Sequence, residues 1–327
     1  MGCRIGRAFA VLCAAAALSG FLAFAGSAQD NYPSQGVKFV VAFAAGGPTD
    51  AIARIFSQRL TEKWGHGVVV ENRGGAGGNI AARQVAKAEP NGYTVLVTTS
   101  AFAVNPTLSA NPGYAPETDY KTVVVAGTTP NVIVANPGLK ASNLKELVEL
   151  AKAEKMTYGM PGAGTTPHLS AEKFFRVLAK VDVPAVPFTG AAPLLNAIVG
   201  GHVGVACLAL PPTIELIKTG QLKALAVISD KRIPSLPDVP TAQEQGFGEG
   251  EESTWIAFFV PAATPPAVLA KLNSETNAVL AEPAIRARLD QLGVIPVGGS
   301  QATSETYVRA EIKKWGDVVR ALGMKVE

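Results

Sequence analysis

Apolar and polar residues recur along the chain with two different periods. Val37–Phe43 is a nearly continuous apolar run of strand length, and Pro48–Lys63 follows it with apolar residues at helical spacing. Val68–Glu71, Ile80–Ala88 and Tyr93–Thr98 continue as strand, helix and strand. The apolar face of the first helix would carry Ile52, Ile55, Phe56 and Leu60. This alternation predicts an α/β protein with mostly parallel sheets.

The second half of the chain repeats this local order. Short apolar runs at Val123–Val125 and Val132–Ala135 read as two further strands, and Leu144–Lys155 reads as a helix with Ser142 or Asn143 as its cap. An extended segment, Met156–Met160, then runs into "PGAGTTPH" and a helix. The apolar face of that helix would carry Ala171, Phe174, Phe175 and Leu178. Two Gly-rich turns, about 115 residues apart, would therefore each lead into a helix in this pattern.

Both turns have the composition of an anion-binding helix N-terminus. "AAGGPTD" and "PGAGTTPH" place proline where its missing N–H costs nothing, after Gly47 or Thr166 as the cap. Free N–H groups at a helix start favour anions, and glycines leave those donors uncovered. The hydroxyls of Thr49, Thr165 and Thr166 add further donors. We therefore expect a carboxylate or similar small anion to be held without a cationic side chain.

Asp50 would repel such an anion, so its place in the first turn needs a reason. At the third helical position its carboxylate can reach back to the N–H of the cap, and this structural role is the favoured interpretation. Contact with a donor group of the ligand is the alternative.

Other chemistries find little support in the sequence. "ENRGGAGGNIAARQVA" resembles a dinucleotide fingerprint, but Ile80 stands where the third glycine or alanine belongs and no acid follows the next strand. His66, His168 and His202 have no metal-ligand spacing, and Gly-x-Ser-x-Gly is absent. His168 is interpreted as a packing or hydrogen-bonding residue rather than a base. We expect no enzymatic activity, no metal and no cofactor.

The first 28 residues predict an exported protein. Arg4 and Arg7 precede an apolar stretch that ends in Gly26-Ser27-Ala28, which is typical of a cleaved signal peptide. Without the two arginines the formal net charge falls from +3 to +1, so no nucleic-acid partner is indicated. Cys207, the one cysteine left after cleavage, lies in an apolar run and is expected to be a buried, inert thiol.

Ordered motifs along the mature chain carry a family resemblance. They are "VVAFAAGGPTDAIAR", "VVVENRGGAGGNIAA", "EPNGYTVL", "YGMPGAGTTPHLSAEKF", "VPFTGAAPLLNAIVGGHV", "GQLKALAVISDKR", "LPDVPTAQEQGF" and "STWIAFFVPAATP". In this order they resemble the periplasmic solute receptors of tripartite tricarboxylate transporters, the Bug family. The resemblance implies a two-lobed type II periplasmic binding protein that closes on a ligand. It implies lobe one at residues 31–130 plus 255–327, lobe two at residues 131–254, and hinge crossings near Thr129–Val134 and Thr254–Val260.

The same resemblance implies the ligand site and the partners. The carried-over site residues are Phe43, Ala45, Gly46, Gly47, Pro48, Thr49, Asp50, Ser100, Gly162, Ala163, Gly164, Thr165, Thr166, His168, Phe188 and Gly190, the last two within the turn Phe188–Ala191. Integral-membrane permease subunits would receive the closed complex of a monomeric receptor. A sensor that presents its ligand to a membrane kinase, or an exported enzyme, are the alternatives.

Two positions depart from the family pattern. Phe188 stands where a tyrosine is frequent, and Gly204 stands where an acid is frequent. Together with Phe43 and Phe102, these departures predict a less polar pocket and an aromatic or branched carboxylate as ligand.

Overall fold

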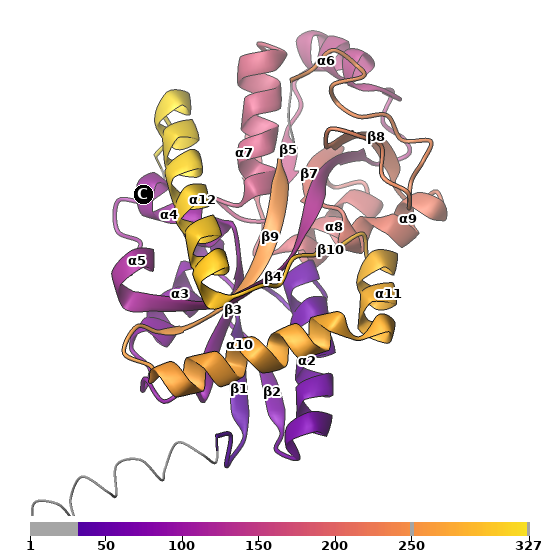
Figure 1. Ribbon diagram of the computed structural model, residues 1–327. Helices are drawn as coiled ribbons and strands as arrows, with labels where there is room; N and C mark the ends of the chain where they lie inside the picture. The colour runs from indigo at the N-terminus through magenta and orange to yellow at the C-terminus, as the bar shows by residue number, and fades with distance from the viewer. Residues whose placement is uncertain (1–31, 249–251, 326–327) are drawn as a thin grey trace, which may run out of the picture.

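The computed structural model describes residues 32–248 and 252–325 (Figure 1). The signal peptide predicted at residues 1–28 lies outside the described residues. The strand order is β2-β1-β3-β9-β4-β7-β5-β6, with β10 and β8 pairing at β4. The strands are β1 (Val37–Val41), β2 (Val68–Asn72), β3 (Thr94–Thr99), β4 (Tyr120–Ala135), β5 (Tyr158–Met160), β6 (Ala185–Pro187), β7 (Val205–Ala209), β8 (Lys223–Ile228), β9 (Ser253–Pro261) and β10 (Ile295–Pro296).

Helices connect and cover these strands in two groups. The first group is α2 (Pro48–Trp64), η1 (Ala76–Gly78), α3 (Asn79–Ala86), α4 (Ala101–Leu108), α5 (Pro116–Asp119), α10 (Pro266–Ala281), α11 (Pro283–Gln291) and α12 (Gln301–Leu322). The second group is α6 (Leu144–Ala153), α7 (Thr166–Glu172), the π-helical turn η2 (Lys173–Leu178), α8 (Ala191–Val199), η3 (Pro211–Thr213) and α9 (Ile214–Lys218). Figure 1 shows most of the second group toward the top and upper right of the molecule, whereas the first group lies mainly at the left and below, with α12 rising along the left side.

The long strand β4 belongs to both halves, which makes the fold two-lobed. Up to Pro130 it pairs with β9 and β10, and from Asn131 it pairs with β7 and β8. The sequence predicted two separate strands, Val123–Val125 and Val132–Ala135, because the polar residues between them interrupt the apolar pattern. Those residues are Thr128, Thr129 and Asn131, and backbone pairing continues through them.

The sheets contain more antiparallel pairing than the sequence predicted. β1 runs parallel to β2 and β3, and β5 runs parallel to β6 and β7, as expected. β9 pairs antiparallel with both β3 and β4, and β4 pairs antiparallel with β7, β8 and β10. The reason is that β4 leads from one half of the molecule into the other and β9 returns beside it. The two strands must therefore run in opposite directions.

Each half carries an apolar core on both faces of its sheet. Successive residues of β1 point to opposite faces, so Val40 packs in one cluster and Val41 in the other. Ile133 and Val134 of β4 divide in the same way in the second half. Cys207 is buried in the second half and burial raises the pKa of its thiol, which agrees with the inert thiol expected from the sequence.

Local capping decides between the two caps predicted for α6 and corrects the cap predicted for α7. Asn143 rather than Ser142 caps α6, because its side chain accepts a hydrogen bond from the N–H of Glu146 at 2.9 Å. The cap of α7 is Thr165 and not Thr166, because α7 begins at Thr166 and the Thr165 hydroxyl accepts from the N–H of His168 at 3.4 Å. Gly47 caps α2 as predicted.

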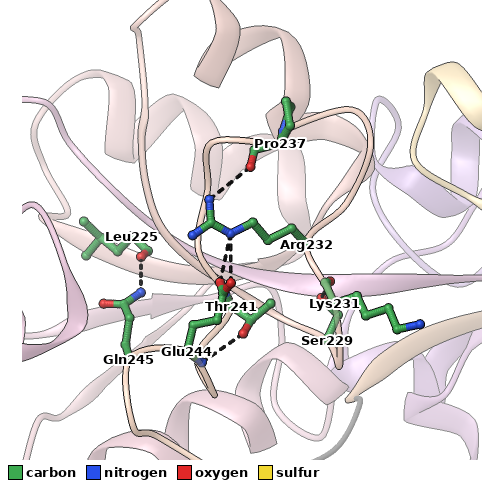
Figure 2. Close-up of polar contacts among 8 residues, drawn as sticks. All are labelled: Leu225, Ser229, Lys231, Arg232, Pro237, Thr241, Glu244 and Gln245. Carbon is green, nitrogen blue, oxygen red and sulfur yellow. Dashed lines mark hydrogen bonds and ion pairs between the residues drawn. The ribbon is translucent and has the colours of Figure 1, made fainter.

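A stretch without helix or strand, residues 229–245, is held by side-chain hydrogen bonds (Figure 2). Arg232 Nε lies 3.0 Å from each carboxylate oxygen of Glu244, and its Nη1 donates to Pro237 O at 3.2 Å. Glu244 in turn accepts from the N–H of Thr241 at 2.7 Å. Arg232 from "SDKR" and Glu244 from "LPDVPTAQEQGF" therefore stabilise the conformation of one loop.

Candidate functional site

The two Gly-rich turns meet in a cleft between the halves. The first turn follows β1 and leads into α2, and the second follows β5 and leads into α7. Between them is an inner cavity, with a volume of about 40 Å³. Its lining is Phe43, Gly47, Pro48, Thr49, Thr99, Pro161, Thr165, Pro167, Ala191, Leu208, Ala209 and Thr254. None of these side chains is charged, so any anion there must be held by backbone N–H groups and hydroxyls.

An outer cavity of about 300 Å³ adjoins it. Its lining is Phe43, Gly75, Ala76, Gly77, Gly78, Pro161, Gly162, Ala163, Pro187, Phe188 and Thr189, again without a charged side chain. The inner cavity reaches the crossing strand β9 at Thr254, whereas the outer cavity is bounded by loops, strand ends and the short helix η1. Phe43 and Pro161 line both cavities, so these two residues lie at their boundary.

The first turn offers unpaired donors to the inner cavity. The cap Gly47 has no side chain, and the N–H groups of Gly47 and Thr49 find no acceptor within the described residues. The Thr49 hydroxyl is likewise without a hydrogen bond in the part of the chain that the structure describes, and it lines the cavity. These groups, together with the positive end of the 17-residue helix α2, form an anion-binding arrangement.

Asp50 is used by the turn itself. Its carboxylate accepts from the N–H of Gly46 at 2.9 Å, from Arg54 Nε at 3.0 Å and from Asn72 Nδ2 at 3.0 Å. Burial alone raises the pKa of this carboxyl, but these three hydrogen bonds and the charge of Arg54 outweigh burial, so the pKa lies below its usual value. The side chain thus reaches back to the turn, to Gly46 rather than to the cap Gly47, and the arginine compensates its charge.

The second turn satisfies several of its own donors. The Thr165 hydroxyl donates to Gly162 O at 2.8 Å, and the N–H of Gly164 donates to His168 Nδ1 at 3.2 Å. Burial lowers the pKa of His168, against a smaller opposing effect of Glu172, so the imidazole is neutral when it accepts this bond. His168 is therefore a hydrogen-bonding residue, as the sequence interpretation favoured.

Thr166 belongs to a buried chain of side-chain hydrogen bonds behind the cleft. Thr254 Oγ1 donates to Asn131 Oδ1 at 2.9 Å, so Thr166 must donate to Thr254 at 2.6 Å, and Ser100 to Thr166 at 3.0 Å. Asn131 Nδ2 continues the chain to Ser170 Oγ at 3.0 Å. All five residues are buried. We define this set as the hinge chain, because it crosses both connecting strands, β4 and β9.

The two halves touch each other directly beside the cavities. A Cβ placed on Gly77 would come within 2.1 Å of the carbonyl oxygen of Ala163, and one placed on Gly164 within 1.8 Å of Asn105 Oδ1. Gly190 lies against Ala44 at a longer distance, since an added Cβ would be 3.3 Å from the Ala44 N. The cleft is therefore in a closed arrangement in which glycines permit backbone-to-backbone contact.

The structure distributes the predicted site residues over three places. Phe43, Gly47, Pro48, Thr49 and Thr165 line the inner cavity. Gly162, Ala163 and Phe188 line the outer cavity, together with Phe43. The others line neither cavity: Ala45, Gly46, Asp50, Ser100, Gly164, Thr166, His168 and Gly190. Several of this last group support the lining residues through the bonds described above.

Sequence reasoning missed part of the lining and misplaced two residues. Thr99, Leu208 and Thr254 line the inner cavity from strand ends. Phe102 is buried against Tyr114, Tyr120 and Phe259 and belongs to the core, so it is not a pocket residue. Gly204 precedes β7, whereas the cavity meets the other end of that strand, so the change at this position does not alter the pocket.

Within residues 32–248 and 252–325, no three metal-ligating side chains come together. A search of the same residues finds no helix with both the length and the apolar character of a membrane span.

These features define a two-lobed α/β solute-binding protein of the periplasmic class. The family model described as tripartite tricarboxylate transporter family receptor matches residues 52–324, and the chain belongs to that family. It is 33% identical to Protein BugT of Bordetella pertussis over 315 residues, which cover 94% of this chain and 96% of BugT.

Solved structures agree. The periplasmic binding protein BugD superposes with a TM-score of 0.87 at 34% identity, covering 90% of this chain and 100% of BugD. Rpa4515 of R. palustris with adipate gives 0.86 at 34% identity, covering 90% and 99% of the two chains. MatC from Rhodopseudomonas palustris with bound malate gives 0.84 at 31% identity, covering 88% and 100%. The protein therefore has a solute-binding role for a transporter of the tricarboxylate type. The receptors of this family are periplasmic, and they are binding proteins rather than enzymes.

Proposed function

We propose that this protein captures a small carboxylate between its lobes and delivers it to integral-membrane permease subunits. The lobes are residues 31–130 plus 255–327 and residues 131–254, and they open and close about β4 and β9. The protein acts as a monomer after export and cleavage of residues 1–28. It releases its ligand chemically unchanged.

The observation that carries the proposal is the set of unpaired donors in a cleft without charged side chains. The N–H groups of Gly47 and Thr49 and the Thr49 hydroxyl face the inner cavity, and Asp50 is neutralised by Arg54. A carboxylate placed there would meet several donors and the positive end of α2. The adipate and malate in the similar structures support the same ligand class.

The proposed site residues act in two ways. Those that line the cavities contact the ligand: Phe43, Gly47, Pro48, Thr49, Gly162, Ala163, Thr165 and Phe188. The others hold these residues in place through backbone geometry and hydrogen bonds: Ala45, Gly46, Asp50, Ser100, Gly164, Thr166, His168 and Gly190. The donors of the first turn are the main carboxylate ligands, because both hydroxyls of the second turn and the N–H of Gly164 are already bonded within the protein.

The rest of the ligand is proposed to be apolar, with an aromatic or branched body. Phe43 and Leu208 border the inner cavity, and Phe188, Pro187 and Pro161 border the outer one. Burial of apolar carbon against these side chains would stabilise a body of that kind more than a strongly polar one.

A thermal-shift screen of residues 29–327 tests the function. The protein is first unfolded and refolded to remove any ligand, then mixed with dicarboxylates, tricarboxylates, acidic amino acids and aromatic acids. A ligand at 100 times its dissociation constant adds about 2.7 kcal/mol to the free energy of unfolding. We expect stabilisation by at least one carboxylate, its loss in Gly47→Val, and recovery of the ligand unaltered. No stabilisation by any of them would contradict the proposal.

A further inference from the structure

The two cavities differ in size, so they fit different parts of one ligand. A buried water needs roughly 10–15 Å³ of cavity space, so the inner cavity of about 40 Å³ has room for a group the size of a carboxylate. The outer cavity of about 300 Å³ reaches the range usual for small-molecule sites. With its carboxylate in the inner cavity, a ligand must therefore place its body in the outer one.

Phe43 and Pro161 line both cavities, so a ligand that extends from one cavity into the other must lie against these two residues. Phe43 is fixed there from two sides. Its carbonyl oxygen accepts from Asn72 Nδ2 at 3.1 Å, and its ring tip lies against Gly78, where an added Cβ would come within 3.5 Å of Cζ. The side chain is only 8% exposed, so the passage has a rigid wall.

We propose that Phe43 is a specificity-determining residue that selects carboxylates whose carbon next to the carboxylate is unbranched. This inference rests on the proposed function and narrows its ligand class. The preferred ligands carry a methylene or a planar carbon at that position, and an apolar or aromatic body beyond it. Branching further along the body is accepted, because the outer cavity is wide.

Two isomeric acids isolate this effect. 3,3-Dimethylbutanoate has a methylene next to its carboxylate, and 2,2-dimethylbutanoate has a fully substituted carbon there, while charge and composition are equal. Both are titrated as competitors of whichever carboxylate binds in the screen. We expect the 3,3-isomer to bind about tenfold or more tightly, because extra methyl groups in a close-packed passage are costly.

Variants then assign the discrimination to Phe43. Phe43→Ala should bring the two affinities within about threefold by widening the passage. Phe43→Met, which retains side-chain volume on a flexible chain, should retain part of the preference. Phe188→Ala, which changes the outer cavity alone, should weaken both isomers alike and leave their ratio unchanged.

The outcomes separate the two proposals. If no carboxylate binds the ligand-free wild-type protein, the proposed function is wrong. If a carboxylate binds but the isomers compete equally, or neither competes, or the Phe43→Ala ratio equals that of the wild type, the role of Phe43 is wrong and the function stands.

Discussion

The two Gly-rich turns look alike in sequence but use their donors differently. In the first turn the carboxylate of Asp50 accepts from the N–H of Gly46, and the N–H groups of Gly47 and Thr49 have no acceptor among the residues that the structure describes. In the second turn His168 accepts from the N–H of Gly164 and the Thr165 hydroxyl donates to Gly162 O, while the N–H groups of Gly162, Ala163 and Thr166 find no acceptor within the described residues. The difference shows that a Gly-rich turn before a helix offers free N–H donors only where neighbouring side chains do not already accept from them.

The hydroxyls show the same contrast. The sequence predicted Thr49, Thr165 and Thr166 as three equivalent donors to a ligand. Thr165 donates to Gly162 and Thr166 donates to Thr254, so of the three only the Thr49 hydroxyl is without a partner in the described part of the chain. Of the three hydroxyls, the one in the first turn is therefore the one that remains available to a ligand.

Gly47→Val should have the largest effect. The φ of Gly47 is −83°, which valine adopts, and an added Cβ would meet only Ala44 O at 3.4 Å, so the fold should persist. The side chain would cover the free donors and fill the small cavity, and we expect carboxylate affinity to fall about 100-fold or more. Calorimetric titration measures this, and circular dichroism checks the fold.

The matching change in the second turn should act differently. Gly164 has φ +75° and touches Asn105, so Gly164→Val strains the backbone and separates the lobes. We expect loss of thermal stability together with weakened binding. A variant with full stability and no binding would instead mean that the two turns are equivalent.

Closure of the two lobes can be tested at Gly77, because Ala163 O occupies the space that a side chain at this position would need. Gly77→Ala should hold the lobes apart and weaken binding about tenfold, because no ligand can be fully enclosed. Gly65→Ala is the matched control, since Gly65 has φ +69°, close to the +62° of Gly77, but no atom within 4 Å of an added Cβ. Small-angle scattering should show a more open shape for Gly77→Ala alone. Equal affinities in both variants would mean that this contact does not limit closure.

Asp50→Asn tests whether the first turn depends on the charged hydrogen bonds of the Asp50 carboxylate. Loss of the ionic hydrogen bond to Arg54 should lower the free energy of unfolding by about 1–3 kcal/mol. The pKa of Asp50 is lowered in the folded protein, so its stabilisation is present above the unfolded pKa of about 3.9 and is lost as pH falls through the folded value.

Urea unfolding between pH 7 and pH 3 measures both effects. The variant should lose less stability on acidification than the wild type. Asp317→Asn, at an exposed ion pair on α12, is the control and should change little. If the free energy of unfolding falls equally with pH in the wild type and in Asp50→Asn, the charge of Asp50 does not contribute to stability.

His168→Asn should have the smallest effect, because the amide oxygen can accept from Gly164 in place of Nδ1. Burial lowers the pKa of His168, so the wild type should lose stability as pH falls below the unfolded pKa of about 6.5. The variant should lack this decline between pH 6.5 and pH 5. Thermal unfolding at each pH measures it, with the exposed His202→Asn as control. A wild-type curve that is flat over this interval would contradict the neutral, buried imidazole.

Local features of the site were predictable and distant ones were not. The reach of Asp50 to the turn follows from helical geometry within four residues, and it was foreseen. Its bond to Asn72 joins residues 22 positions apart and depends on how β1 and β2 pair. Likewise, Leu208 and Thr254 enter the cavity only because β7 and β9 both lie beside β4, which apolar periodicity does not encode.

Aromatic residues were the weakest part of the prediction. Phe43 and Phe102 both follow the end of a strand, and both were used to predict a less polar pocket, although only Phe43 was among the predicted site residues. Phe43 borders both cavities, whereas Phe102 packs among three other aromatic rings. Phe43 lies in the turn that follows β1, whereas Phe102 lies in the first turn of α4, and tertiary packing places the turn at the cleft and the helix residue in the core.

The hinge chain has a consequence for how readily the receptor gives up its ligand. Its members are hydroxyls and an amide, and when the lobes separate, water can take the place of each broken partner. A typical exchanged hydrogen bond then costs only about 0.5–1.5 kcal/mol, whereas exposing a fully apolar hinge would carry a cost for every carbon uncovered. A polar hinge thus keeps the free-energy difference between the closed and the open form small. The transporter can therefore reopen the receptor with modest binding energy.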